Sequence, residues 1–330
     1  MQNKRILFIN FGGIGDEILF LPSILSVKKQ FPNAHISLAL ESRSKGISTL
    51  TNVIDETIEA DIKSKNKFFE LIKLLLKIHK DHYDIVVSSG ANKFISILLY
   101  LTCIKKRYGY DTGILSKLLL TQAIPLNKNQ YAVNMYHDLV TPITDFKTFL
   151  PELDIQKQEI ESNIVLIHPG VSKISVDKGM VKTISAIEWA KVIELLYNSG
   201  KKVKLIGGPD DKQCIDTIKE IVSPEKFENL YGSTKNLKEL AELISASEKF
   251  LCSDSAPLHI AVGLGVKTYV IFGSTDDKKL IPQSDKVIPI KADCDCPLMP
   301  CLWERRQTTC KRLDCLKIPP EKIVETILNG

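Results

Sequence analysis

The chain has 330 residues, of which 44% are hydrophobic, and this is enough to fill the cores of two domains of ordinary size. Its formal net charge at pH 7 is +5, from 44 Lys and Arg against 39 Asp and Glu. A charge balance this mild suits anionic small molecules or an anionic membrane surface, and it excludes a protein that binds nucleic acid through its overall charge.

The N-terminal sequence MQNKRILFIN enters an apolar run that is too short for a secretory signal peptide, and no small-residue cleavage site follows it. The longest apolar stretch, near residues 94–104, is too short to span a bilayer. We therefore expect a cytoplasmic protein whose only membrane contact is peripheral, at the inner membrane surface.

Strands and helices are expected to alternate through the first half of the chain. Apolar patterns predict strands over 5–10, 35–40 and 85–88, and helices from the first loop to about residue 30, over 67–80 and over 94–103. This alternation indicates a parallel, doubly wound sheet. Residues 145–162 interrupt it with charge and little periodicity. We expect an N-terminal domain over 1–150, a linker over 151–162 and a C-terminal domain over 163–330.

The alternation restarts in the second half. Strands are predicted over 164–168, 202–206, 250–252 and 267–272, and helices over 186–199, 211–222, 237–245 and up to residue 264. The chain is thus expected to hold two Rossmann-like α/β domains, with ligands in the cleft between them.

The loop after the first strand contains Gly13 and Gly15, which let the backbone approach a ligand closely. Asp16 follows at the first turn of a helix, where a carboxylate serves either as a helix cap or as a general base toward a hydroxyl. The dinucleotide fingerprint is incomplete, because Ile18 stands where a third Gly or Ala is expected. Glu41, at the end of the second strand, keeps a nicotinamide-binding alternative open.

Two loops of the second half carry charge at strand ends. The first begins at His168 and contains Lys173, Lys178 and Lys182, which could each bind a diphosphate. A lysine at that place would stabilise the negative charge on a departing diphosphate. The second contains Asp210, which suits either ribose hydroxyl groups or the cap of the next helix.

Residues 250–272, FLCSDSAPLHIAVGLGVKTYVIF, predict a strand, a helix and a second strand. Asp254, Ser255 and Pro257 are helix-start signals, and Gly265 is a helix-stop signal. A helix that starts at the carboxyl end of a parallel strand presents free N–H groups to a ligand. The segment therefore predicts a phosphate-binding site at the start of this helix, with the Asp254 carboxylate at its edge. The alternative is a βαβ unit with a capped helix and no ligand.

Five cysteines lie within residues 294–315, and two pairs share one spacing, Cys296-x4-Cys301 and Cys310-x4-Cys315. Paired thiolates suit a tetrahedral structural site for zinc or iron, whereas disulfides are disfavoured in a reducing cytoplasm. Free thiols in a loop are the alternative.

Five sequence blocks occur in order: GGIGDEILFLP, IHPGVS followed by lysine and tryptophan, GGPDD, SDSAPLHIAVGLGV followed by FGSTD, and the cysteine-bearing tail. Together they resemble glycosyltransferase family 9, the bacterial heptosyltransferases, over nearly the whole chain. The resemblance implies the GT-B fold, two Rossmann-like domains facing across a cleft. It implies transfer of heptose from ADP-heptose to the lipopolysaccharide core, or another cell-surface glycan acceptor, with inversion and without a cofactor or catalytic metal.

The resemblance also implies roles for single residues. Asp16 would be the base that deprotonates the acceptor hydroxyl, in a loop shaped by Gly13 and Gly15. Lys182 would bind the diphosphate, because it lies seven residues before Trp189 as in the family, although Lys178 stays open.

Donor contacts are implied in the second half. Asp210 would contact the ribose, Asp254 the donor sugar, and the N–H groups of Ser255 and Ala256 the diphosphate. Ala256 stands where the family usually has Gly. The loop that contains Ser172 and Thr183 is longer than in the family. Relatives that modify autotransporters carry a four-cysteine iron site, which favours a metal at the tail.

Two other function classes stay open on the residues alone. One is an NAD(P)-dependent oxidoreductase, and the other is a catalytically silent, metal-binding relative that acts as a scaffold.

Overall fold

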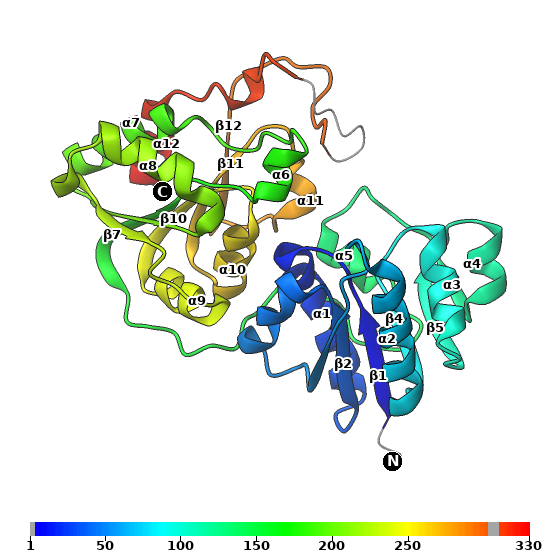
Figure 1. Ribbon diagram of the computed structural model, residues 1–330. Coiled ribbons are helices and arrows are strands. Elements are labelled where there is room, and N and C mark those ends of the chain that lie inside the picture. Colours follow the sequence, from blue (N-terminus) through cyan, green and yellow to red (C-terminus); the bar gives the residue numbers. More distant parts are fainter. Residues whose placement is uncertain (1–3, 303–309) are drawn as a thin grey trace. The chain divides into compact units, whose positions relative to one another are not determined.

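The computed structural model describes residues 4–302 and 310–330. The chain folds as two compact units, Met1–Asp154 and Ile155–Gly330, and in each of them strands alternate with helices (Figure 1). Among the described residues, none of the helices combines the length and the apolar composition needed to cross a bilayer.

The N-terminal unit is organised around a six-stranded sheet in which all neighbours pair in parallel. Its order is β3-β2-β1-β4-β5-β6, so the winding reverses between β1 and β4. In the register, Leu7 of β1 lies opposite Ser37 of β2 and Val86 of β4. The strands are β1 (Arg5–Ile9), β2 (His35–Leu40), β3 (Glu56–Glu59), β4 (Ile85–Ser88), β5 (Lys106–Tyr110) and β6 (Gln122–Ile124).

Helices cover both faces of this sheet, because right-handed crossovers place helices on opposite faces when the winding changes direction. α1 and α5 pack against each other, while apolar side chains of α2 and α3 share a core with the strands. The helical segments are α1 (Ile14–Gln30), η1 (Ser42–Leu50), α2 (Lys67–Asp81), α3 (Lys93–Leu101), α4 (Ile114–Leu119) and α5 (Ala132–His137).

The C-terminal unit repeats this connectivity. Its parallel sheet has the order β12-β11-β10-β7-β8-β9, so the winding reverses between β7 and β10. The strands are β7 (Glu161–His168), β8 (Lys202–Gly207), β9 (Glu228–Tyr231), β10 (Ser247–Ser253), β11 (Lys267–Phe272) and β12 (Val287–Lys291). The helical segments are α6 (Lys173–Asp177), α7 (Ala186–Asn198), η2 (Pro209–Asp211), α8 (Lys212–Ile221), η3 (Pro224–Lys226), α9 (Leu237–Ser245), α10 (Ala256–Leu264), α11 (Asp277–Leu280), η4 (Asp314–Leu316) and α12 (Pro320–Asn329).

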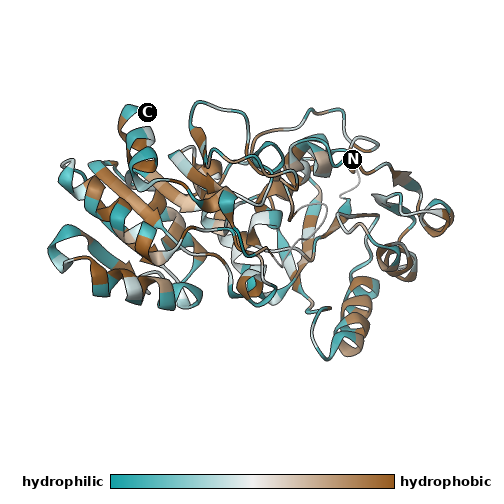
Figure 2. Ribbon diagram, turned by 90° about the horizontal axis from the view of Figure 1, so that it is seen from above, coloured by the Kyte–Doolittle hydropathy of each residue, from teal (hydrophilic) through white to brown (hydrophobic). Residues whose placement is uncertain are grey.

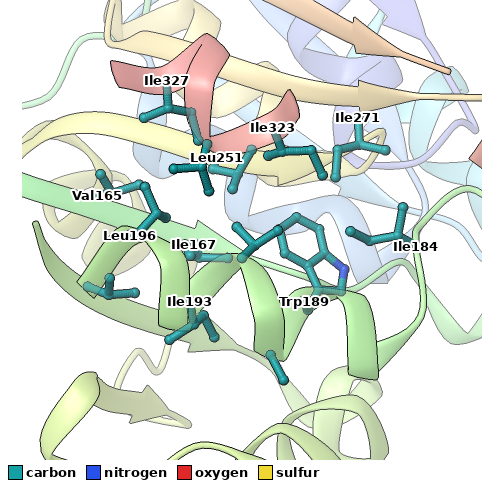
Figure 3. Close-up of a cluster of buried hydrophobic side chains, with 14 of the residues drawn as sticks. Val165, Ile167, Ile184, Trp189, Ile193, Leu196, Leu251, Ile271, Ile323 and Ile327 are labelled. Carbon is teal, nitrogen blue, oxygen red and sulfur yellow. The ribbon is translucent and has the colours of Figure 1, made fainter. Parts of the chain in front are cut away.

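The core of the C-terminal unit is built around Trp189 of α7, which is fully buried (Figure 3). Its ring lies among Ile184, Ile271 of β11 and Ile323 of α12, and its Nε1–H donates a 2.9 Å hydrogen bond to Thr183 Oγ1. Figure 2 shows the hydropathy pattern behind this burial. The strands are hydrophobic along most of their length, whereas the helices alternate between hydrophobic and hydrophilic residues.

The strands and helices predicted from apolar periodicity are confirmed, and β2, β4 and β11 have the predicted bounds. The pattern missed five strands of three to five residues, namely β3, β5, β6, β9 and β12. It also missed the short helices α4, α5, α6 and α11, and the ten-residue α12. Elements of three to six residues contain too few positions to show a period.

We expect Trp189→Ala to destabilise the C-terminal unit by about 3–5 kcal/mol, because it leaves a large cavity and removes the hydrogen bond to Thr183. Urea unfolding measures the loss. Ile187→Ala, a change at an exposed position of the same helix, is the control and should unfold as the wild type does. Equal unfolding midpoints for both variants would contradict the packing described.

Candidate active site

The loop that follows β1 reaches the switch point between β1 and β4, where α/β proteins place ligands. A Cβ at Gly12 would lie 2.4 Å from the Asp16 Cβ, so glycine is required there. The Gly13 N–H donates a 2.8 Å hydrogen bond to Asp16 Oδ2, and Gly15 lies in the first turn of α1. The exposed Asp16 carboxylate is thereby held in place with further lone pairs available to accept a proton from a hydroxyl.

Tyr136 of α5 also contacts this carboxylate, and sequence reasoning missed it. Its hydroxyl donates to Asp16 Oδ1 at 3.3 Å, and its ring packs on Phe20 with centroids 5.3 Å apart. Burial, and next the negative charge of Asp16, raise the pKa of Tyr136 well above its usual range, so the phenol stays a donor. The two residues are 120 positions apart, and no local pattern links them.

Glu17, next to Asp16, is fully buried, and neither carboxyl oxygen has a hydrogen-bond partner among the described residues. Burial raises the pKa of Glu17 well above its usual range, and repulsion from Asp16 and Glu41 adds to the shift. Burial thus favours the protonated form of Glu17, whereas the neighbouring Asp16 carboxyl is exposed to solvent.

Glu41, the residue that would hold a nicotinamide cofactor's ribose, is already paired within the protein. Its carboxylate lies 2.7 Å from Arg43 Nε and 2.9 Å from Lys63 Nζ. The Gly13 N–H, which a pyrophosphate would need, is bonded to Asp16. These contacts do not support the dinucleotide alternative.

The C-terminal unit brings Lys182 and Asp254 together at its own switch point, between β7 and β10. Lys182 Nζ donates to Asp254 Oδ2 at 2.9 Å, and the two side chains are 21% and 5% exposed. Burial by itself would raise the pKa of Asp254, but the charge and hydrogen bond of Lys182 outweigh it and lower the pKa below its usual range. Asp254 is therefore a buried carboxylate that stays ionised.

α10 begins directly after this pair, with Ser255 as N-cap and Ala256 as the first helical residue. The first N–H groups of a helix have no partner inside it and attract anions. His168, at the end of β7, orients the cap: its Nδ1 lies 3.4 Å from Ser255 Oγ and its Nε2 lies 3.2 Å from Asp211 Oδ2. A cation and a helix N-terminus thus meet beside Asp254.

Asp210 lies at the surface after β8, and its Oδ2 accepts a 2.8 Å hydrogen bond from the Lys173 N–H. It lines a cavity of about 850 Å³ together with Pro169 and Gly170. A cavity of this size holds a ligand as large as a nucleoside.

Two predicted loop residues form hydrogen bonds within the protein. Thr183 Oγ1 donates to the Pro169 carbonyl at 2.7 Å and accepts from Ser253 Oγ at 2.7 Å, in addition to Trp189. Ser172 caps α6. Lys178 ends α6, and within residues 4–302 and 310–330 it forms no ion pair, unlike Lys182.

The five tail cysteines line one cavity of about 500 Å³ and form no disulfide. Burial, and next the neighbouring thiols Cys301, Cys294 and Cys310, raise the pKa of Cys315 to about 11. Cys294, which the predicted set left out, thus lies near Cys315. In the described part of the chain, no three His, Cys, Asp or Glu side chains are placed to hold a metal ion. The set Cys296, Cys301, Cys310 and Cys315 is therefore not assembled as a metal site here.

The depressed pKa of Asp254 predicts a pH dependence. An acid whose pKa is lowered by folding stabilises the protein above its unfolded pKa, near 3.9, and this contribution disappears as pH falls through the folded value. We expect Asp254→Asn to cost about 3 kcal/mol at pH 7 and progressively less below about pH 4. Urea unfolding at a series of pH values measures it, and Asp216→Asn, in an exposed pair, is the control. A pH-independent difference between wild type and Asp254→Asn would contradict the assignment.

The sequence profile of glycosyltransferase family 9 (heptosyltransferase) matches residues 71–310. Lipopolysaccharide heptosyltransferase 3 of Escherichia coli is 27% identical over 302 residues, which cover 83% of this chain and 85% of that protein. The solved structure of E. coli ADP-heptose lps heptosyltransferase II matches with a TM-score of 0.76 at 19% identity, over 98% of both chains. The iron-containing dodecameric glycosyltransferase TibC from enterotoxigenic E. coli H10407 matches with a TM-score of 0.60 at 13% identity, over 100% of this chain and 77% of that one.

The solved structures confirm the fold class, the GT-B architecture of two Rossmann-like units. The family profile covers well over half of the chain and confirms the resemblance carried by the sequence blocks. The chain is a glycosyltransferase and belongs to glycosyltransferase family 9, the heptosyltransferase family.

Proposed function

We propose that this glycosyltransferase moves heptose from ADP-heptose to a hydroxyl of the lipopolysaccharide core or another cell-surface glycan, with inversion at the anomeric carbon. The observation that carries the proposal is the Lys182–Asp254 pair at the N-terminus of α10, because a sugar diphosphate needs a cation and N–H donors together. The names of two E. coli relatives, which specify ADP-heptose and lipopolysaccharide, support this donor and this acceptor.

The donor contacts belong to the C-terminal domain, 163–330 in our assignment. Lys182 and the N–H groups of Ser255 and Ala256 stabilise the negative charge that develops on the departing diphosphate. Lys182 exchanges part of its interaction with Asp254 for the phosphate oxygens, and the Asp254 carboxylate accepts hydrogen bonds from sugar hydroxyls. Asp210, beside the cavity after β8, accepts hydrogen bonds from the ribose.

The acceptor belongs to the N-terminal domain, 1–150, where Asp16 is the base. The acceptor oxygen forms a bond to the anomeric carbon while the bond from that carbon to the diphosphate oxygen breaks. Asp16 takes the hydroxyl proton, and ADP leaves with the electron pair. A single displacement from the opposite face inverts the anomeric carbon. Asp16 is suited to this step because it is exposed and is held by hydrogen bonds from Gly13 and Tyr136.

The acceptor is proposed to be an anionic glycolipid or glycan, which the net charge of +5 favours over a cationic one. A cytoplasmic location with peripheral contact to the inner membrane is part of the same proposal, since such acceptors are anchored in lipid. Nucleic acid is not among the proposed partners.

A separate proposal concerns the C-terminal tail. We infer that its cysteines bind one structural iron or zinc ion, without a role in catalysis, because four thiolates leave no open position on the metal. Their gathering around one cavity and the iron content of TibC support this. The neighbours of Cys315 point to Cys294 as a better ligand candidate than Cys296.

Two variants with reciprocal defects test the transfer reaction. Asp16→Asn should lower turnover by about 100- to 10,000-fold and leave ADP binding intact, because it removes only the base. Lys182→Ala should lose most of the thermal stabilisation by ADP, which amounts to about 2.7 kcal/mol at 100 times Kd. Turnover is measured with ADP-heptose and a delipidated core oligosaccharide, and binding is measured by thermal shift.

Lys178→Ala is the matched control, because this lysine lies in the same loop and should keep ADP stabilisation. If it loses the stabilisation in place of Lys182→Ala, the diphosphate ligand is Lys178. Stabilisation by UDP or GDP alone would exclude ADP-heptose as donor, a response to NAD alone would indicate an oxidoreductase, and no response to any nucleotide would indicate a scaffold. An Asp16→Asn enzyme with most of its turnover would refute the base assignment.

For the tail, metal analysis of anaerobically purified protein should find about one equivalent of iron or zinc. We expect Cys315→Ser and Cys294→Ser to lose the metal and Cys296→Ser to keep it. Wild-type protein with less than about a tenth of an equivalent would refute the proposal.

A further inference from the structure

One face of the N-terminal sheet is covered by three helices whose outer sides remain apolar. The connections from β3 to β4, β4 to β5 and β5 to β6 all run in the same direction, so right-handed crossovers put α2, α3 and α4 on the same face. α3 packs against α4, and His79 Nε2 of α2 donates a 3.1 Å hydrogen bond to the Leu101 carbonyl at the end of α3. We call the outer surface of these helices the α2–α4 face.

α2 uses only part of its apolar surface to cover the sheet. Leu74 and Ile78 are buried in the core, whereas Phe68, Phe69 and Leu76 point outward, and Phe69 is 73% exposed. Residues 68, 72 and 76 lie four apart, which places them in one stripe along the helix. The exposed stripe is therefore a second apolar side, in addition to the one that packs on the strands.

Exposed apolar side chains also lie on the other two helices of this face. On α3, Phe94 and Leu101 are more than 40% exposed, and on α4, Ile114 and Leu118 are 78% and 74% exposed. These three helices carry half of the exposed large apolar side chains that the described residues contain. Scattered single apolar residues are normal on a protein surface, but such a concentration on the helices of one sheet face is typical of a binding surface.

The charges around the α2–α4 face are mainly positive. The three helices, residues 67–81, 93–101 and 114–119, contain six Lys against two Asp and Glu. Lys73, Lys80 and Lys93 form no ion pair within residues 4–302 and 310–330, and all three are exposed. Unpaired lysines beside exposed Phe, Ile and Leu are the composition of helices that lie in a membrane interface, where the rings enter the lipid and the ammonium groups meet anionic headgroups.

A second copy of the chain fits this surface less well. A symmetric dimer joins the same patch of both copies, so the unpaired lysines of one would face those of the other. An anionic bilayer instead supplies both an apolar interior and negative charge. We propose that the α2–α4 face docks the protein on an anionic lipid bilayer.

The position of this face relative to Asp16 links the docking to the transfer reaction. This step rests on the proposed function. In a parallel sheet the helices start at the edge where the strands end, so Phe68, Phe94 and Ile114 lie toward the same edge of the unit as Asp16. A glycolipid acceptor presents its sugar to that edge while its acyl chains stay in the bilayer. The reaction then takes place at the membrane surface without extraction of the lipid.

Flotation of the full chain with phosphatidylcholine vesicles containing about 30 mol % phosphatidylglycerol tests the docking, with pure phosphatidylcholine vesicles in parallel. The wild type should float with the anionic vesicles and far less with the neutral ones, and high salt should weaken the binding. Phe68→Ser/Phe69→Ser should lower the partition coefficient at least about tenfold. Lys73→Glu/Lys80→Glu should lower it by about fivefold or more per lysine.

Ile160→Ser/Ile187→Ser, which removes exposed apolar side chains from the C-terminal unit, is the matched control and should bind as the wild type does. The Phe68→Ser/Phe69→Ser protein should also keep its turnover on a delipidated oligosaccharide, so a failure of docking and a failure of the proposed function give different results. Wild-type protein that stays with the buffer, or a face variant that floats unchanged, would overturn the proposal. So would a wild-type dimer in sedimentation that the Phe variant abolishes.

Discussion

Parallel pairing of every strand is the constraint on which the rest of this structure depends. Because each strand must return to the same end before the next one starts, all carboxyl ends meet at one edge and each sheet has one point where the winding reverses. The loops after β1 and β4, and those after β7 and β10, diverge at these two points. Asp16 lies at the first of them and the Lys182–Asp254 pair at the second, so the residues proposed to carry the reaction lie where α/β folds leave room for a ligand.

The two switch points are built on different electrostatic principles. Around Asp16 the protein exposes one carboxyl group to solvent, while it buries the neighbouring Glu17 and so raises the pKa of that carboxyl. Around Asp254 it buries a carboxylate and keeps it ionised with Lys182. An exposed carboxylate can exchange a proton with an incoming hydroxyl, whereas a buried ion pair is a stable arrangement that a diphosphate can enter by taking over the cation.

The N-terminal unit concentrates exposed apolar side chains on three helices, whereas the core around Trp189 in the C-terminal unit is enclosed. Trp189 is surrounded by side chains from strands and from α7 and α12, so little of that core reaches solvent. The outer sides of α3 and α4 carry apolar side chains that remain exposed. No further layer of the described chain lies over Ile114 or Leu118. This difference supports the proposals that the N-terminal unit docks on lipid and that the C-terminal unit binds a water-soluble donor.

Local sequence determined most of the secondary structure, the α/β class and the helix caps, because periodicity and start or stop residues act within a few positions. The Gly-Asp loop and the DSAPLH block also carried the family resemblance, since a loop at a strand end needs particular residue types. Tertiary structure alone decided which side chains meet. The bond from Tyr136 to Asp16 spans 120 positions, the pairing of Lys182 with Asp254 spans 72, and the neighbourhood of Cys294 and Cys315 depends on how the tail folds. Such contacts arise from packing between elements, which no local pattern encodes.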